Sequence, residues 1–251
     1  MMKIIKDILR PWIPMRILSE YRGYIDRKTA KQLNEVFSGK EPKFIFTKIY
    51  KDKLWGIDKD GGFFSGSGSH DPFFVAPYVA SVKAFLHEFP EKPSVVDLGC
   101  GDFNVGSQLV EAASQYTACD IVDELIENHK KKYSGLNVHF LSLDITTDSL
   151  PHGTVGIIKE ALQHLSNEKI FSVLPKLKAY QFLIISEYHP RGEFQPNIDQ
   201  PCGAHSRTTR GVQSGVILTD PPFSLKVLNE RILSEVEGDS GVLRTVVYQM
   251  K

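Results

Sequence analysis

A short apolar run that ends in a glycine-rich turn constrains the fold of this chain more than any other feature. Ser94–Leu98 reads as a buried strand, and Gly99-Cys100-Gly101 follows it without a break. Glycine at such a turn lets a ligand approach the backbone, because no side chain stands in the way. A helix is expected next, over 105–113, with unpaired N–H groups at its start. This strand-turn-helix pattern predicts a ligand site at the end of a strand in an α/β sheet.

Strand and helix patterns alternate over the rest of the chain. Further strands are expected at 116–120, 138–144, 155–159, 181–186, 225–233 and 242–250, and further helices at 72–89, 122–133 and 169–177. Such alternation favours parallel strands joined by right-handed crossovers, whereas the last two strands have the signature of a hairpin. We therefore predict a Rossmann-like α/β fold, a three-layer sandwich whose mostly parallel seven-stranded sheet ends in an antiparallel hairpin.

The N-terminal part of the chain differs from the rest. Residues 1–40 read as helical, with prolines that interrupt the first segment, and are predicted to form an N-terminal extension to a domain over 41–251. The apolar residues of 1–18 fall on one helical face. This pattern suits either peripheral contact with an anionic membrane surface or packing on the domain. Early in the domain, 44–50 has strand character.

Composition disfavours several classes of protein. The 251 residues are 41% hydrophobic and 24% charged, which is enough apolar material for a sizeable core. The formal net charge is zero, and proteins that grip a phosphate backbone usually carry a basic surplus, so no nucleic-acid partner is expected. Three cysteines without a CxxC spacing predict neither a disulfide framework nor a zinc site. We identify no other metal site, and reduced thiols favour the cytoplasm.

Three carboxylates stand where successive expected strands end. Asp97 lies just before the first glycine, Asp120 ends the next strand and Asp144 ends the third. An acid at the second position, about twenty residues after the glycines, can accept hydrogen bonds from both ribose hydroxyls. An acid at the third can accept from an adenine amino group while Ile121 and Ile145 sandwich the ring. Because a carboxylate beside the glycines suits an ammonium group better than a pyrophosphate, the pattern predicts a nucleoside with a cationic tail.

With these residues the chain resembles the class I S-adenosylmethionine-dependent methyltransferases. Val95-Val96-Asp97-Leu98-Gly99-Cys100-Gly101 is similar to the first motif of that family, and 158–167 is similar to the segment after its fourth strand. The closing hairpin is similar to the family's reversed last strand. The resemblance covers roughly 70–251. It implies that 41–251 is a methyltransferase domain with S-adenosyl-L-methionine as its cofactor.

The resemblance also implies which residues bind the cofactor. Asp97 and Gly99 would face the methionine moiety, Asp120 the ribose and Asp144 the adenine amine. The loop 65–69 would cover the cofactor and hold its carboxylate, unless it is a plain surface loop. The implied cofactor-binding residues are Ser65, Gly66, Ser67, Asp97, Gly99, Gly101, Asp120, Ile121, Asp144, Ile145 and Glu160.

Two histidines follow expected strands at the edge where the methyl group should point. His164 comes after the fourth strand and His189 after the fifth. An alcohol acceptor needs a general base, and histidine is the usual one near neutral pH, so both are candidate catalytic residues. The favoured prediction is O-methylation of a small polar acceptor such as a sugar or glycan. Arg191, Arg207 and Arg210, in a long polar segment, would meet an anionic group on it.

Several alternatives stay open from the sequence. N-methylation of a small amine or a protein side chain would use Trp55, Asp58 and Asp60 to bind a cation. A non-catalytic scaffold would bind the cofactor without the chemistry. A nicotinamide oxidoreductase is disfavoured by Asp97 and by the displaced third glycine, Gly106. The sequence does not indicate an oligomeric state.

Overall fold

The computed structural model describes residues 33, 35–208, 212–238 and 241–251. The chain divides at residue 38 into two units, and the unit Gly39–Lys251 contains one seven-stranded sheet. Its strands are β1 (Ser94–Leu98), β2 (Gln115–Asp120), β3 (Val138–Ser142), β4 (Val155–Lys159), β5 (Phe182–His189), β6 (Val227–Gly238) and β7 (Gly241–Met250). The predicted extension over 1–40, with its membrane-facing alternative over 1–18, lies almost entirely outside the described residues and stays a prediction.

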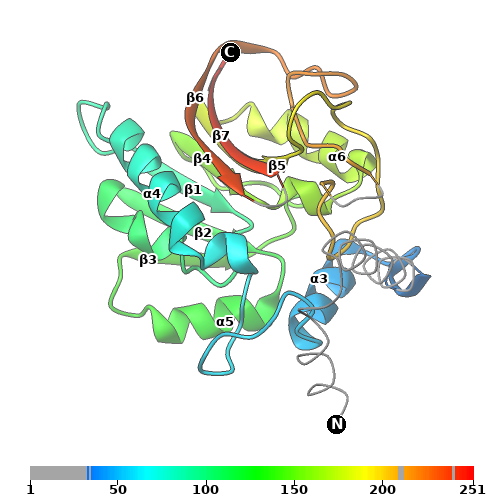
Figure 1. Cartoon of the computed structure of the whole chain (residues 1–251). Helices are drawn as coiled ribbons and strands as arrows, with labels where there is room; N and C mark the ends of the chain where they lie inside the picture. The colour runs from blue at the N-terminus through cyan, green and yellow to red at the C-terminus, as the bar shows by residue number, and fades with distance from the viewer. Residues whose placement is uncertain (1–32, 34, 209–211, 239–240) are drawn as a thin grey trace, which may run out of the picture. The chain divides into compact units, whose positions relative to one another are not determined.

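The strand order is β3-β2-β1-β4-β5-β7-β6 (Figure 1). β1, β2, β3, β4 and β5 pair in parallel, whereas β7 runs antiparallel to both β5 and β6. The predicted mostly parallel sheet with a closing hairpin is therefore confirmed. From β1 the chain builds the sheet outward through β2 to β3 on one side, and it then returns to add β4 and β5 on the other side of β1. In open α/β sheets such a reversal opens a crevice at the carboxyl ends of the strands.

Four longer helices accompany the sheet among the described residues: α3 (Pro42–Lys51), α4 (Pro72–Leu86), α5 (Asp123–Lys132) and α6 (Asn167–Leu177). α4 begins where the Asp71 carboxylate accepts the Phe73 N–H at 2.9 Å. α6 begins in the same way at Ser166, whose hydroxyl accepts the Lys169 N–H at 3.4 Å. In the part of the chain that the structure describes, no helix combines the length and apolar character needed to cross a membrane.

Two apolar clusters hold the layers together. Val82 of α4 packs in a cluster with Val95 of β1, and Val173 of α6 packs in another with Val96. Because successive side chains of a strand point to opposite faces, α4 and α6 cover opposite sides of the sheet (Figure 1). A sheet covered on both faces needs continuous apolar strands, which is why the predicted parallel strands stand out in the sequence.

The segment 44–50 lies within helix α3, so the expected strand there was wrong. The buried residues Pro42, Ile45 and Ile49 recur at helical spacing. Proline at the first helical position favours the start of the helix. Phe44 is 48% exposed, and this exposed aromatic residue created the apparent alternation.

The helix expected over 105–113 was also wrong. Two short 3-10 turns, Gly106–Gln108 and Val110–Ala112, take its place. A Cβ at Gly106 would collide with the Phe103 ring and with Oδ2 of Asp97. The close approach of the chain to β1 therefore requires glycine, which weakens a helix at this point.

Candidate active site

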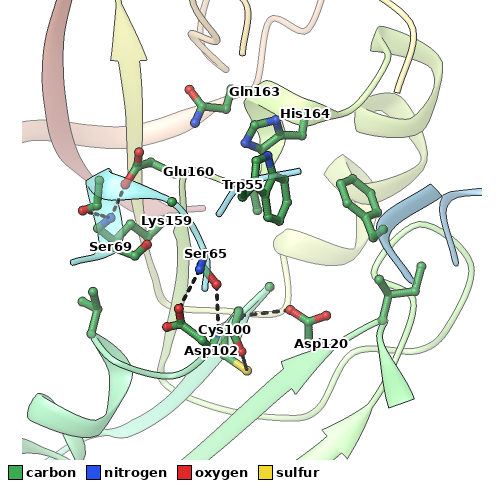
Figure 2. Close-up of a pocket in the computed structure, with 18 of the residues that line it drawn as sticks. Trp55, Ser65, Ser69, Cys100, Asp102, Asp120, Lys159, Glu160, Gln163 and His164 are labelled. Carbon is green, nitrogen blue, oxygen red and sulfur yellow. Dashed lines mark hydrogen bonds and ion pairs between the residues drawn. The ribbon is translucent and has the colours of Figure 1, made fainter. Parts of the chain in front are cut away.

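The carboxyl ends of the central strands open into a cavity of about 310 Å³ (Figure 2). All the predicted cofactor-binding residues line it: Ser65, Gly66, Ser67, Asp97, Gly99, Gly101, Asp120, Ile121, Asp144, Ile145 and Glu160. His164 lines the same cavity, whereas His189 does not. The three strand-end carboxylates thus share one cavity, and their roles toward a cofactor stay predictions.

The turn after β1 is folded against the end of β2. Gly99 and Gly101 have φ angles of 83° and 56°, a region that favours glycine. The N–H groups of Gly99 and Cys100 both donate to the Cys119 carbonyl oxygen at 2.9 Å. The Gly101 N–H donates to Oδ2 of Asp120 at 3.0 Å. These bonds place the glycine backbone on the cavity wall, next to the Asp120 carboxylate.

Asp97 and Asp120 are buried carboxylates, with 6% and 7% of their surface exposed. Burial raises the pKa of Asp97 to about 7, although a 3.0 Å hydrogen bond from the Tyr116 hydroxyl opposes the shift. Burial likewise raises the pKa of Asp120 to about 6, against a 3.0 Å bond from the Val122 N–H. Among the described residues, neither carboxylate forms a salt bridge. A cationic ligand would supply the missing partner.

Ser65 fastens the loop before α4 over the glycine turn, in a contact that we call the Ser65 latch. Its Oγ accepts the Asp102 N–H at 2.8 Å and lies 2.7 Å from the Tyr50 hydroxyl of α3. Its own N–H donates to Oδ2 of Asp102 at 2.6 Å (Figure 2), and His70 Nε2 lies 2.6 Å from the same oxygen. A Cβ at Gly101 would collide with the Ser65 hydroxyl. The loop is therefore packed directly on the turn.

Asp144 and the two isoleucines line the wall beyond β2 and β3. β3 ends at Ser142 rather than at 144, so Asp144 lies in the following loop. Its Oδ1 accepts the N–H and the hydroxyl of Thr146 at 2.8 and 2.7 Å. Oδ1 of Asp144 thus holds the loop after β3 in place on the cavity wall.

Lys159 and Glu160 stand together at the end of β4. Glu160 has a φ of 52°, and its N–H donates to the Ser186 carbonyl oxygen at 2.7 Å. Lys159 pairs with Glu160, and its Nζ also donates to the Gly68 carbonyl oxygen at 3.1 Å. The Lys159 Nζ lies 5.5 Å from the centre of the Tyr78 ring. The pair thus places one positive and one negative side chain next to the loop 65–69, which lines the cavity.

His164 and Gln163 occupy the short turn after β4, at another part of the cavity wall (Figure 2). The imidazole packs against Trp55, with ring centres 5.0 Å apart. Burial lowers the pKa of His164 to about 4, although hydrogen bonding to the backbone of His205 opposes the shift. The ring is therefore neutral near pH 7 (about three pH units above its pKa). Gln163 is 4% exposed, and its Oε1 has no hydrogen-bond partner in the described parts of the chain.

The polar segment between β5 and β6 also reaches the cavity. Ala204, Ser206 and Thr208 contribute to its lining. The Trp55 indole N–H donates to the Ala204 carbonyl oxygen at 2.9 Å. Segments about 150 residues apart in the sequence thus meet beside His164.

His189 is held inside the fold. β5 continues to His189, which pairs with Val242 of β7, whereas the sequence suggested that the strand ended at Ser186. The ring Nε2 lies 3.1 Å from the Val216 carbonyl oxygen, and burial lowers the pKa of His189 to about 4. The structure therefore brings one of the two candidate histidines to the cavity.

The arginines suggested for an anionic acceptor have other partners. Arg207 is fully buried and donates to the Leu165 carbonyl oxygen at 2.6 Å. Arg191 donates to the Gly238 carbonyl oxygen at 2.6 Å. Arg210 lies outside the described residues. Arg207 therefore anchors the polar segment to the turn after β4 and does not line the cavity.

Of the three residues suggested for a cationic amine, Trp55 lines the cavity and the two acids do not. Asp58 accepts a hydrogen bond from the Asp60 N–H within a turn after α3, and Asp60 is exposed. Of the three examples suggested for N-methylation, the aromatic residue thus reaches the cavity, which also contains the carboxylates of Asp102 and Glu160. Asp58 and Asp60 are close in sequence to Trp55, but the turn directs them elsewhere.

Sequence reasoning missed several residues that line the cavity: Phe46, Tyr50, Tyr78, Asp102, Lys159 and Gln163. Asp102 directly follows the glycine turn and Lys159 lies within the recognised segment 158–167, so their positions alone were a usable signal. Tyr50 was not identified because the segment 44–50 was incorrectly predicted as a strand. Gln163 lies beside His164, but nothing in its local sequence distinguishes a buried glutamine from an exposed one.

Comparisons with known proteins agree with this geometry. Residues 95–180 match a family model described as a methyltransferase domain. No curated protein matches the sequence. The N-methyltransferase NodS from Bradyrhizobium japonicum WM9, solved with S-adenosyl-L-homocysteine, is similar in structure at 12% identity, with a TM-score of 0.59 over 82% of this chain and 98% of that chain.

Two further structures with bound S-adenosylmethionine share the fold. Magnesium protoporphyrin IX methyltransferase from Synechocystis PCC 6803 has 16% identity and a TM-score of 0.55 over 85% of this chain and 99% of its own. Human N-acetylserotonin methyltransferase has 16% identity and a TM-score of 0.56 over 92% of this chain and 67% of its own. Since these enzymes are named for different acceptors, the shared fold does not identify the acceptor. Residues 95–180 thus match a methyltransferase domain, and the chain around the β1 glycine turn has the fold of S-adenosylmethionine-dependent methyltransferases.

Proposed function

We propose that this methyltransferase O-methylates a small polar acceptor, such as a sugar or a glycan, with His164 as the general base. The supporting observation is a neutral imidazole on the cavity wall at the carboxyl edge of the sheet. An acceptor held against Trp55 and the 204–208 segment would place a hydroxyl beside this ring. Holding the reacting groups in such a geometry supplies much of the rate of a displacement reaction.

Methylation of a hydroxyl oxygen releases the hydroxyl proton, which a base must accept. S-adenosylmethionine supplies an electrophilic methyl group on its sulfonium centre. The acceptor O–H becomes strongly acidic as its oxygen bonds to carbon, so even a weakly basic imidazole takes the proton. With a pKa of about 4, His164 then loses this proton to solvent at neutral pH. The histidine is thus neutral again before the next reaction.

The remainder of the cavity fits the cofactor. Two buried carboxylates without salt-bridge partners suit a ligand with an ammonium group and a sulfonium. In this assignment Asp97 and Glu160 meet the ammonium group, and Asp120 meets the ribose. Asp144 meets the adenine amine, and Ile121 and Ile145 lie on either side of the ring. Gly99 and Gly101 allow close approach, while Ser65, Gly66 and Ser67 cover the methionine carboxylate. The proposed assignment uses every cofactor residue suggested by the resemblance.

Cofactor binding is expected to release protons. In the free protein the pKa of Asp97 is raised to about 7 and that of Asp120 to about 6, so both bind protons as the pH falls through this range. The ammonium group of the bound ligand favours their ionised forms. The affinity for S-adenosylhomocysteine should therefore fall by about tenfold or more between about pH 7 and about pH 5.

Calorimetry in two buffers of different ionisation enthalpy measures this proton release directly. Asp97→Asn removes the carboxyl with the higher pKa, so its proton release should be confined to the lower part of the range. A dissociation constant that is independent of pH, with no proton release, would contradict the assigned carboxylates.

The Ser65 latch gives a second test of the cofactor site. Ser65→Ala removes the hydroxyl that accepts the Asp102 N–H and hydrogen-bonds to the Tyr50 hydroxyl, and should weaken binding of S-adenosylhomocysteine by about tenfold. Ser172→Ala is the matched control, since its hydroxyl donates to the Lys169 carbonyl oxygen on an exposed part of α6. Equal affinities for Ser65→Ala and Ser172→Ala would show that the latch does not support the cofactor.

Methyl transfer into a fractionated cell extract tests the acceptor class. With a labelled methyl group on S-adenosylmethionine, label is expected in the sugar-containing polar fraction and not in protein. Mild base hydrolysis separates ethers from methyl esters, because only the esters release their label. Label in small amines or protein would instead favour N-methylation and overturn the proposed acceptor.

A further inference from the structure

We propose that Gln163 is a specificity-determining residue whose side-chain oxygen accepts a hydrogen bond from a second donor group on the methyl acceptor. The inference rests on the proposed function, because it requires the acceptor to lie beside His164. It adds a requirement that methyl transfer alone does not impose: the acceptor carries a hydrogen-bond donor besides the hydroxyl that is methylated.

The first observation is an unpaired oxygen in a buried side chain. Gln163 is 4% exposed and lines the cavity, yet its Oε1 has no hydrogen-bond partner among the residues that the structure describes. Buried polar atoms are nearly always paired, and leaving one unpaired is costly. A ligand donor at the cavity wall would satisfy this oxygen.

The second observation is that the backbone of Gln163 is held on both sides. Its N–H donates to Oε2 of Glu187 at 3.2 Å, and its carbonyl oxygen accepts Nε2 of Gln200 at 2.6 Å. The main chain is thus fully used within the protein. The side-chain amide is therefore the part of Gln163 left to meet a ligand, and its oxygen is the buried atom without a partner among the described residues.

Glu187 acts as a positioning residue for this turn. It is 1% exposed, and its other oxygen accepts the Leu162 N–H at 2.9 Å. Glu187 therefore caps two N–H groups at the start of the turn that carries Gln163 and His164. A turn fixed in this way holds both side chains in one arrangement before the acceptor binds, which favours selective recognition.

Together, the side chains of His164 and Gln163 indicate which class of acceptor the cavity would bind. His164 would receive the proton of one hydroxyl, while Gln163 would accept a hydrogen bond from another. A polyhydroxylated compound such as a sugar supplies both donors. A simple alcohol would leave the glutamine oxygen unpaired, and sites built around a hydrogen bond reject such analogues.

The experiment compares Gln163→Met with wild type, with the sugar-containing fraction of a polar cell extract as the acceptor. The amount of this fraction that gives half-maximal methylation should rise by about tenfold in Gln163→Met. The affinity for S-adenosylhomocysteine should stay within about twofold, since Gln163 is not assigned to the cofactor. Gln181→Met makes the same substitution at an exposed position at the opposite edge of the sheet, and should leave both values unchanged.

Two variants separate recognition from a structural effect. Gln163→Glu keeps an oxygen in the same place and should restore half-saturation toward the wild-type value. Gln163→Asn withdraws the amide by one methylene and carries the test if Gln163→Met does not bind S-adenosylhomocysteine. Unchanged half-saturation in Gln163→Met or Gln163→Asn overturns the inference alone. A wild-type protein that leaves the sugar fraction unlabelled overturns the proposed function as well.

Discussion

Asp120→Ala is expected to weaken the affinity for S-adenosylhomocysteine by about 100-fold or more. The Asp120 carboxylate accepts the N–H groups of Gly101 and Val122, both at 3.0 Å, and is assigned to the ribose hydroxyls. Each hydrogen bond to a charged group contributes about 1.5–3 kcal/mol. Alanine removes the ligand contact and frees the glycine turn at the same time. Isothermal calorimetry with the purified protein measures the change.

Glu127→Ala supplies the control for this variant. Glu127 pairs with Lys130 on α5, with 2.8 Å between the charged atoms and both side chains at least half exposed. Exposed pairs of this kind contribute about 0–1 kcal/mol, so the affinity should not change. Thermal unfolding of both variants checks that the fold is retained. Wild-type affinity in a folded Asp120→Ala protein would remove Asp120 from the site.

His164→Ala is expected to lower kcat by about 100- to 10,000-fold, the usual contribution of a general base. Binding of S-adenosylhomocysteine should change by less than about threefold, because the proton transfer concerns the acceptor. Rates of labelled methyl transfer at saturating acceptor give kcat directly. His164→Gln preserves much of the volume without a basic nitrogen, and should be equally slow.

A comparison of histidines decides whether the loss is specific. His87→Ala, at the exposed end of α4, should behave as wild type. His189→Gln should lower the melting temperature, because it disturbs the contact with the Val216 carbonyl oxygen, but it should leave kcat within a few-fold of wild type. If His164→Ala keeps its full kcat, the acceptor does not need this base, and an amine acceptor becomes the better explanation.

Much of the fold was predictable because its strands are buried on both faces. Val155–Lys159 begins and ends as predicted, since a continuous apolar run between polar loops has few other structures to adopt. The hairpin of β6 and β7 was equally clear from its turn. The strand predicted over 44–50 failed because a short run of aromatic residues fits either period. Which side chains of the segment are buried against the rest of the domain decides between a helix and a strand.

Part of the site was predictable for a topological reason. Asp97, Asp120 and Asp144 meet at one cavity because the carboxyl ends of parallel neighbours lie at the same edge of the sheet. His189 was expected at that edge too. Three further residue pairs with β7, at Glu187, Tyr188 and His189, keep it inside the sheet. The residue at which a strand ends is rarely evident from the sequence alone.

The sequence by itself determined the order of the seven strands of the sheet, the glycine turn and the carboxylates beside it. These features depend on neighbours close along the chain, where apolar periodicity and glycine act directly. The tertiary structure alone decided that Tyr50 and Ser65 close over the glycine turn, and that Glu187 holds Gln163 beside His164. Those contacts join segments far apart in the sequence, so packing of the whole domain, and no local pattern, brings them together.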